Sequence, residues 1–184
     1  MKLNIIHLPN RLDRLQLLEA QLDEQEIRDY KIWPGILDSD NPKKGIAKAH
    51  KQVVQWAKDQ GLDSIIIAED DLKFTAPRAF DFFIKNEPTN FDIYLGGITY
   101  GKINRNGSVN DFAGTHLYKI RQKFYDTFLL TPEEKDIDRS LANKGRFIVC
   151  DPLVAIQHNG FSDNQRKFQI YDPCFKNRKL FGQT

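Results

Sequence analysis

Three adjacent carboxylates follow a short apolar run in this 184-residue sequence. The run 64–68 carries no charge and leads directly into Glu69, Asp70 and Asp71. Such a run is typical of a strand covered on both faces, and alternation along it would place Glu69 and Asp71 on one face and Asp70 on the other. Because adjacent carboxylates repel one another, the triplet suits a hard divalent cation with oxygen ligands. The alternative is an ordinary solvated strand end.

Basic residues stand where the first predicted strand passes into the first predicted helix. His7 lies near the end of the strand, and Arg11 and Arg14 follow the break at Pro9. In α/β sheets this position contacts nucleotides or phosphates, and the planar guanidinium of arginine suits phosphate recognition. We therefore assign His7, Arg11 and Arg14 to a cofactor site. A solvated helix face is the alternative for the two arginines.

Two further candidates lie in the elements on either side of the acidic strand. His50 shares the inward face of a helix predicted over 45–61, where a histidine is either a core residue or a ligand contact. Gly96 and Gly97 follow a strand predicted over 91–95, and their lack of side chains would let the backbone approach a ligand. We assign all three to the cofactor site, with a core histidine and a simple turn as the alternatives.

The remaining candidates come late in the chain. A capping box that begins at Thr131 predicts a helix over 131–145. Asp136 and Asp138 fall early in that helix, where favourable interaction with the helix dipole is one reason for an acidic residue. His158 follows the last predicted strand and could complete a metal site with the acids, because imidazole and carboxylate both bind manganese.

The elements that must position these residues alternate between strand and helix. Apolar runs predict strands at 3–8, 30–33, 64–68, 91–95, 116–120, 147–150 and 153–157. Helical periodicity predicts helices at 12–22, 45–61, 77–85, 122–130 and 131–145. The segment 102–114 shows little periodicity, and a loop of that length is more often a functional flap than an idle connection. Together these patterns predict an α/β fold with a mostly parallel central sheet flanked by helices.

Composition and length are those of one ordinary globular domain, because 40% of the residues are hydrophobic and 28% are charged. We expect a single domain over 1–184, with a core at about 3–163 and a C-terminal tail at 164–184. The 27 basic residues are spread along a chain of formal charge +2, so nucleic-acid binding is not predicted.

Three further features bear on location. The N-terminus lacks the apolar stretch of a signal peptide, and no apolar run approaches the roughly 20 residues that span a bilayer. Cys150 and Cys174 fit neither a disulfide framework nor a zinc pattern. We therefore expect a cytoplasmic protein without a membrane span. Peripheral association with a membrane and the oligomeric state stay open.

Six short motifs occur in a fixed order, at 6–14, 45–50, 65–71, 114–118, 137–141 and 152–157. In order and spacing they resemble glycosyltransferase family 25, the lipooligosaccharide-type galactosyltransferase group, over about residues 3–163. The acidic strand is the most specific of the six. The sequence departs from the family pattern at His7, where Asn is usual, and at Ala49, which replaces Ser.

The resemblance implies a GT-A-like nucleotide-sandwich fold and a nucleotide-sugar donor, expected to be UDP-linked. The acceptor would be a saccharide or glycolipid in surface polysaccharide or lipooligosaccharide synthesis. Glu69, Asp70 and Asp71 would then be the family's variant of the Asp-x-Asp motif. In that motif Asp71 is the metal ligand, and Glu69 or Asp70 holds the ribose or supports the metal.

The same resemblance suggests roles for residues outside the triplet. Asp138 becomes a candidate for orienting or deprotonating the acceptor hydroxyl, and with Asp70 it makes up the predicted catalytic pair. His158 becomes an additional ligand to Mn²⁺ or Mg²⁺, beside Asp71 and Glu69. The segment 102–114 could close over the donor and exclude water.

Two other classes of function share some of these features. A metal-dependent phosphohydrolase or phosphotransfer domain also places acids at strand ends. Here, however, the triplet follows the third strand rather than the first, and no nucleophilic Asp motif opens the chain. A non-catalytic relative would keep the fold and bind a nucleotide or glycan without metal-dependent turnover.

Overall fold

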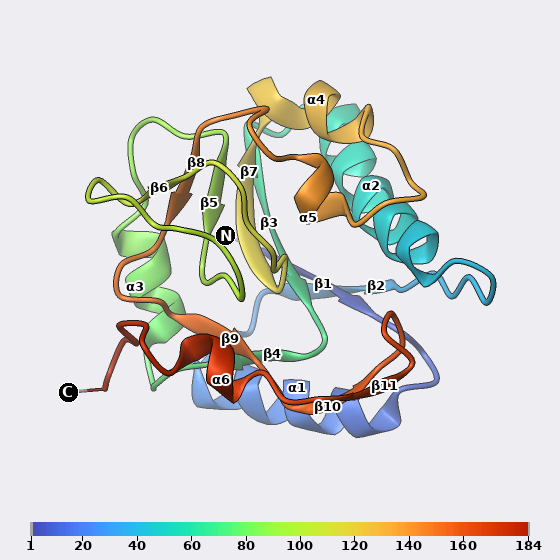
Figure 1. Cartoon of the computed structure of the whole chain (residues 1–184), viewed down its shortest axis with the longest axis horizontal. Coiled ribbons are helices and arrows are strands. Elements are labelled where there is room, and N and C mark those ends of the chain that lie inside the picture. The colour runs from blue at the N-terminus through green and yellow to red at the C-terminus, as the bar shows by residue number, and fades with distance from the viewer. Residues whose placement is uncertain (1, 184) are drawn as a thin grey trace.

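A seven-stranded sheet forms the centre of the computed structural model, which describes residues 2–183 (Figure 1). Its strands are β1 (Leu3–His7), β2 (Tyr30–Pro34), β3 (Ser64–Glu69), β5 (Ile93–Leu95), β6 (Ser108–Val109), β7 (Leu117–Arg121) and β8 (Phe147–Val149). Their order across the sheet is β2-β1-β3-β7-β5-β8-β6. Only β7 and β6 run antiparallel to their neighbours within this sheet of the described chain. The predicted α/β class with a mostly parallel sheet is therefore confirmed.

Helices cover both faces of the sheet. On one face lie α1 (Leu12–Glu24) and α3 (Ala79–Lys85), and on the other lie α2 (Pro42–Asp59), α4 (Tyr125–Leu129) and α5 (Ile137–Ser140). Side chains of β3 alternate between these layers, because Ile65 and Ile67 pack toward α2 whereas Ile66 and Ala68 pack toward α1. Both layers exclude water from β3, which explains why its sequence carries no charge before Glu69.

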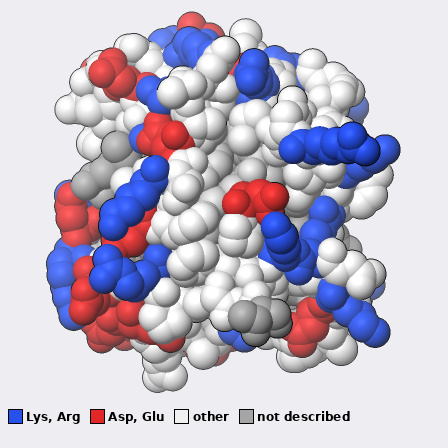
Figure 2. All heavy atoms as spheres, turned by 90° about the vertical axis from the view of Figure 1, so that its left-hand side faces the viewer, with Lys and Arg blue, Asp and Glu red and all other residues white. Residues whose placement is uncertain are grey.

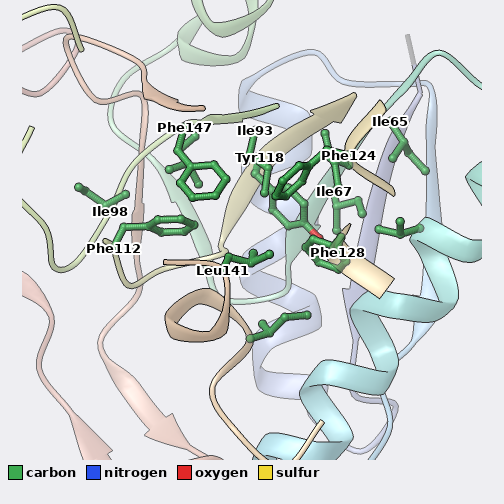
Figure 3. Packing of buried hydrophobic residues seen from close by; sticks show 14 of the residues in the cluster. Ile65, Ile67, Ile93, Ile98, Phe112, Tyr118, Phe124, Phe128, Leu141 and Phe147 are labelled. Carbon is green, nitrogen blue, oxygen red and sulfur yellow. The ribbon is translucent and has the colours of Figure 1, made fainter. Parts of the chain in front are cut away.

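The core on the α2 side is rich in aromatic residues. Phe112, Phe124, Phe128 and Phe147 surround the apolar side chains of the sheet between β7, α4 and α5 (Figure 3). Tyr118 joins them from β7, and its ring stacks on Phe128 at 6.1 Å between centroids. The abundance of Phe in the sequence therefore serves the core.

Most predicted elements are present, but the helix predicted over 131–145 is wrong. Only α5 is helical in that stretch. The Thr131 hydroxyl donates to the Phe128 carbonyl at 2.8 Å, so it closes the end of α4 instead of capping a new helix. A 3₁₀ turn, η1 (Gln122–Phe124), directly precedes α4. The predicted helix over 45–61 begins earlier than expected, with Pro42 in its first turn.

Beyond β3 the chain forms a second layer at the carboxyl edge of the sheet. β4 (Leu72–Phe74) pairs antiparallel with β9 (Ala155–Gln157). A hairpin of β10 (Gly160–Ser162) and β11 (Lys167–Gln169) follows, and then α6 (Asp172–Phe175). Sequence reasoning left this tail without a structure. In the structure the tail packs on the rest of the domain. Leu180 forms an isolated β-bridge with Leu153, and the side chain of Phe175 is buried.

No helix within residues 2–183 is long and apolar enough to cross a membrane. On the face that Figure 2 shows, basic and acidic side chains are interspersed. Cys150 is buried and Cys174 is exposed, and both are free thiols in the described chain.

Candidate functional site

The acidic triplet lies where β3 ends, next to the end of β1 and the start of β7. Glu69 is the last residue of β3, and Asp70 and Asp71 form the turn into β4. Because β7 is antiparallel to β3, the residues that precede β7 lie at the same edge, and the Glu69 amide donates to the His116 carbonyl at 3.1 Å. The topology therefore brings segments far apart in the sequence to one place.

Glu69 points toward α2 and is held by two neighbouring side chains. The Thr115 hydroxyl donates to Glu69 Oε1 at 2.5 Å, and His50 Nε2 lies 3.2 Å from the same oxygen. His50 is buried, as predicted, and its Nδ1 lies 2.9 Å from the Tyr118 hydroxyl. Burial alone would raise the pKa of Glu69, but the contacts with His50 and Thr115 outweigh it and lower that pKa to about 2. Glu69 is therefore a carboxylate at neutral pH.

Asp70 points the other way, toward α1, as the alternation predicted. Arg14 Nη1 donates to Asp70 Oδ1 at 2.7 Å, and His7 Nδ1 lies 2.9 Å from Oδ2. The Leu8 amide also donates to Oδ2, at 3.2 Å. Both oxygens of this buried side chain are thus engaged by protein donors. In this arrangement Asp70 fixes the start of α1 against the end of β3.

The negative charge of Asp71 is less well balanced by hydrogen-bond donors and positive charges than the charges of Glu69 and Asp70. Gln157 Nε2 lies 3.3 Å from each of its carboxylate oxygens, and Arg14 Nη1 lies 3.6 Å from Oδ2. Burial and the charge of Glu69 raise the pKa of Asp71 to about 7, against the opposing charge of Arg14. The charge of Arg14 alone therefore does not offset the burial of Asp71 and its repulsion by Glu69.

His158 lies next to Asp71. The His158 amide donates to the Asp71 carbonyl at 2.8 Å, and both residues line one small cavity of about 30 Å³. The buried His158 Nε2 has no hydrogen-bond partner among the described residues. Burial lowers the pKa of His158, so the imidazole is held in its neutral, ligand-competent form.

These two residues fit a divalent cation only in part. Among residues 2–183, no three His, Cys, Asp or Glu side chains group closely enough to hold a metal ion. The predicted set Asp71, Glu69 and His158 is therefore not such a group, and Glu69 is engaged by Thr115 and His50. Asp71 and the unpartnered His158 Nε2 could each offer one ligand to a divalent cation, which would need its other ligands from another molecule.

Two larger cavities open on the same triplet. One of about 100 Å³ borders all three acids and is lined elsewhere mainly by apolar side chains. The other has a volume of about 620 Å³ and borders Glu69. Its other charged and hydroxyl-bearing side chains are those of Lys43, Thr99, Tyr100, Thr115, Asp136, Asp138, Arg139 and Tyr171.

Asp138 lies in the first turn of α5 and lines the larger cavity. The amide of Gly114 donates to Asp138 Oδ2 at 2.9 Å, and the amide of Arg139 donates to Oδ1 at 2.7 Å. Gly114 has φ of 112°, a conformation that favours glycine. Burial raises the pKa of Asp138, which increases its basicity. The structure thus brings Asp138 to the cavity that Glu69 also borders.

Arg11 and Arg14 converge on the β10–β11 hairpin. Both guanidiniums donate to the Phe161 carbonyl, at 3.0 Å and 2.9 Å. Arg11 Nη1 also donates to Asp163 Oδ2 at 2.5 Å. Both arginines therefore lie at the site, but their guanidiniums are already paired with carboxylates of the protein.

The two predicted glycines have neighbours within the protein. A Cβ on Gly97 would lie 1.9 Å from the Ala155 carbonyl oxygen, and one on Gly96 would lie 2.6 Å from the Leu117 side chain. Neither glycine lines the three cavities above. Close packing of strands is the observed reason for the absence of side chains here.

Sequence reasoning missed the site residues that the C-terminal tail provides. Asp163 and Asn164 line the cavity of about 100 Å³, and Gln165 and Tyr171 line the cavity of about 620 Å³. Nothing periodic marks these positions. These residues reach the site because the chain turns back across the carboxyl edge of the sheet, and a local sequence pattern does not predict such a turn.

The fold resembles solved structures of low sequence identity. A glycosyltransferase involved in the glycosylation of the major capsid of PBCV-1 matches with a TM-score of 0.55 at 10% identity, over 95% of this chain and 98% of that one. The A197 protein from STIV matches at 0.53 and 16% identity, over 92% and 93%. HddC from Yersinia pseudotuberculosis, complexed with GMP-PN, matches at 0.50 and 14% identity, over 82% and 90%. No protein-family model and no curated protein matches the sequence.

At these identities the likeness establishes the fold alone. The chain has a glycosyltransferase-like fold, which agrees with the α/β class and the coarse part of the sequence prediction. Membership of family 25 in particular stays a prediction.

Proposed function

We propose that this protein is a metal-dependent glycosyltransferase that moves a sugar from a UDP-linked donor to a saccharide or glycolipid acceptor. One observation carries the proposal. Glu69, Asp70 and Asp71 border adjoining cavities at the carboxyl edge of a glycosyltransferase-like sheet. Ligands of open α/β sheets bind at this edge. The resemblance to family 25 supports an acceptor in surface polysaccharide or lipooligosaccharide synthesis.

The cavity of about 100 Å³, which borders all three acids, suits the nucleotide. Its apolar lining can cover a base, and Arg14 lies at its border next to Asp70. Arg11 and Arg14 are suited to diphosphate oxygens through their planar guanidiniums. HddC, the neighbour complexed with GMP-PN, supports a nucleotide role for this fold.

Asp71 and His158 are the residues that would hold the cation. When bound, a divalent cation neutralises the diphosphate and stabilises it as a leaving group. Glu69 stays ionised beside this position because His50 and Thr115 hold it, so it can accept hydrogen bonds from sugar or ribose hydroxyls.

The larger cavity suits the sugar and the acceptor. Asp138 faces it with a raised pKa, so this carboxylate can orient an acceptor hydroxyl and take its proton. The Gly114 amide ties Asp138 to the end of the segment 102–114. The flap predicted over 102–114 is not supported, because the segment contains β6, which pairs with β8, and the buried Phe112 of the core.

Thermal unfolding with nucleotides tests this proposal. The protein is heated with UDP, UDP-glucose, UDP-galactose or GDP-mannose, each with and without Mn²⁺. We expect stabilisation by UDP and a UDP-sugar only when the metal is present, because a ligand that binds the folded state stabilises it by roughly 2.7 kcal/mol at 100 times its Kd. Asp71→Asn should abolish the response. Asp59→Asn, at the exposed end of α2, is the matched control and should keep it.

The alternatives give different results. Turnover of a simple phosphate ester without any sugar nucleotide would favour a phosphohydrolase or phosphotransfer domain. Nucleotide binding that needs neither metal nor Asp71 would favour a non-catalytic relative. No response to any nucleotide with Mn²⁺ or Mg²⁺ would rule out the proposed donor site.

A further inference from the structure

The side chain of Asn164 holds a buried hydrogen-bond acceptor without a donor. Asn164 lies in the turn of the β10–β11 hairpin and lines the cavity of about 100 Å³. Its side-chain oxygen Oδ1 is buried and has no hydrogen-bond partner among residues 2–183. Burial of an amide oxygen without a donor is unfavourable, and such atoms are uncommon in folded proteins. An acceptor of this kind beside a cavity therefore indicates a donor that arrives with a ligand.

The turn that carries Asn164 is held on both sides. The residue before it, Asp163, accepts from Arg11 Nη1 at 2.5 Å. The amide of the residue after it, Gln165, donates to Ser162 Oγ at 3.2 Å. The whole hairpin lies along α1 (Figure 1). Asn164 therefore borders the cavity from a turn whose position is set by contacts within the protein.

The rest of this cavity combines apolar side chains with charged ones. The apolar side chains come from β1, the segments that follow β1 and β2, and α2, and they are Ile6, Leu8, Ile36, Ile46 and Ala49. Besides the charged side chains, the lining holds two polar ones, His50 and Asn164. Both ring nitrogens of His50 are already in contact with Glu69 and Tyr118. Asn164 is therefore the polar side chain that is left to orient a ligand between the apolar ones.

A nucleobase fits this lining better than a sugar does. A base has apolar faces that pack against apolar side chains, and its polar groups lie in the ring plane, where an amide can pair with them. In uracil the N3–H group lies between two carbonyl groups, so it can meet an amide that both accepts and donates. The hydroxyls of a sugar project around the whole ring, and apolar walls would leave several of them unpaired.

We propose that Asn164 selects the donor by its base, with Oδ1 accepting a hydrogen bond from N3–H of uracil and Nδ2 donating to a neighbouring carbonyl of the base. The inference rests on the proposed function, because it takes the cavity of about 100 Å³ as the nucleotide site. It adds the residue that reads the base. Asn164 follows the last of the six motifs, which ends at residue 157, so the resemblance assigns it no role.

Calorimetric titration with three probes tests this role, each in the presence of Mn²⁺. The probes are UDP, 3-methyl-UDP, in which a methyl group replaces the N3 hydrogen, and inorganic pyrophosphate. We expect the wild-type protein to bind 3-methyl-UDP about tenfold or more weakly than UDP, because the hydrogen bond to Oδ1 is lost. Asn164→Ala should bind UDP about tenfold more weakly than the wild type and should no longer distinguish the two nucleotides. Pyrophosphate has no base, so both proteins should bind it alike.

Two further variants separate base recognition from misfolding. Asn164→Asp keeps an accepting oxygen, so its preference for UDP over 3-methyl-UDP should persist even where its added charge weakens the binding of both. Asn90→Ala removes an exposed asparagine from the segment before β5 and should match the wild-type protein in all three titrations. Thermal unfolding without ligand shows whether each variant is folded.

Three results would overturn the inference. Equal binding of UDP and 3-methyl-UDP by the wild-type protein would show that no acceptor meets N3–H. If Asn164→Ala weakened pyrophosphate as much as UDP, Asn164 would only hold the hairpin and Asp163 in place. In both cases the donor site itself would stand, because the wild-type protein still binds UDP with Mn²⁺. Binding of neither UDP nor pyrophosphate by the wild-type protein would instead remove the proposed donor site, and the role of Asn164 with it.

Discussion

The carboxylate of Asp163 lies 2.5 Å from Arg11 Nη1, although 152 residues separate them in the sequence. Arg14 Nη2 lies 3.9 Å from the same oxygen. A carboxylate of the hairpin thus occupies the guanidiniums that we assign to the donor diphosphate. The hairpin and a diphosphate would compete for the same donors.

This competition predicts that Asp163→Asn strengthens binding of inorganic pyrophosphate and UDP. Asparagine keeps the size of the side chain but removes one of the two carboxylate charges on Arg11, the other being that of Asp13, so affinity should rise by roughly tenfold, about 1.4 kcal/mol. Calorimetric titration measures the change, and Asp59→Asn is the control of equal chemistry. Unchanged or weaker binding would mean that the arginines serve only to hold the hairpin.

Glu69 gives the folded state a pH dependence in acid. Its pKa of about 2 lies below its usual value of 4.5, so its contribution to stability is present above pH 4.5 and is lost as the pH falls toward 2. Glu69→Gln should therefore flatten the loss of unfolding free energy over that range, by on the order of 2 kcal/mol. Urea unfolding at several pH values measures it. The exposed Glu19→Gln is the control, and identical pH profiles for both variants would contradict the stabilisation of the Glu69 carboxylate by His50 and Thr115.

The sequence predicted best what local physics decides. The uncharged run of β3 required burial on both faces, and the acids that follow it lie at the sheet edge as expected. His50 shared a periodic apolar face and is buried. These features depend on neighbours in the chain or on the commonest strand topology, so one sequence contains the necessary information.

Local signals failed where two structures competed for the same residues. The residues from Thr131 onward match the pattern of a helix N-terminus, yet the Thr131 hydroxyl donates to the Phe128 carbonyl and ends the preceding helix. The contact between Arg11 and Asp163 leaves no trace in periodicity, because its two members belong to opposite ends of the chain. The hairpin was also missed, since its exposed Phe161 and Phe168 do not alternate with polar residues in a long strand.

We expect Asp71 to destabilise the folded, metal-free protein at neutral pH. Its folded-state pKa of about 7 exceeds its usual 3.8, so the unfolded chain loses the proton first and the cost grows between pH 4 and pH 7. Asp71→Asn should raise Tm at pH 8 with EDTA by several degrees, at about 2–4 °C for each kcal/mol, and change it little at pH 4. Asp59→Asn should not shift Tm at either pH. A lower Tm at pH 8 would show that Asp71 is compensated without a cation.

Gly97 should tolerate no side chain. A Cβ there would lie 1.9 Å from the Ala155 carbonyl oxygen, so Gly97→Ala must push β9 away from the sheet. We expect a loss of about 3 kcal/mol of unfolding free energy, measured by urea titration. Gly160→Ala is the control, because no atom lies within 4 Å of its Cβ position. Equal stability of the two variants would contradict the close packing of β9 on the sheet.

Asp138 offers the sharpest test of chemistry, because its role can be separated from binding. Asp138→Asn keeps an oxygen to accept from the Gly114 amide but cannot take a proton, so kcat should fall by about a hundredfold or more while the Kd of the donor is unchanged. Radiolabelled transfer and titration calorimetry measure the two quantities. Asp126→Asn, exposed on α4, is the control. If Asp138→Asn weakened donor binding and left kcat intact, Asp138 would hold substrate rather than activate the acceptor.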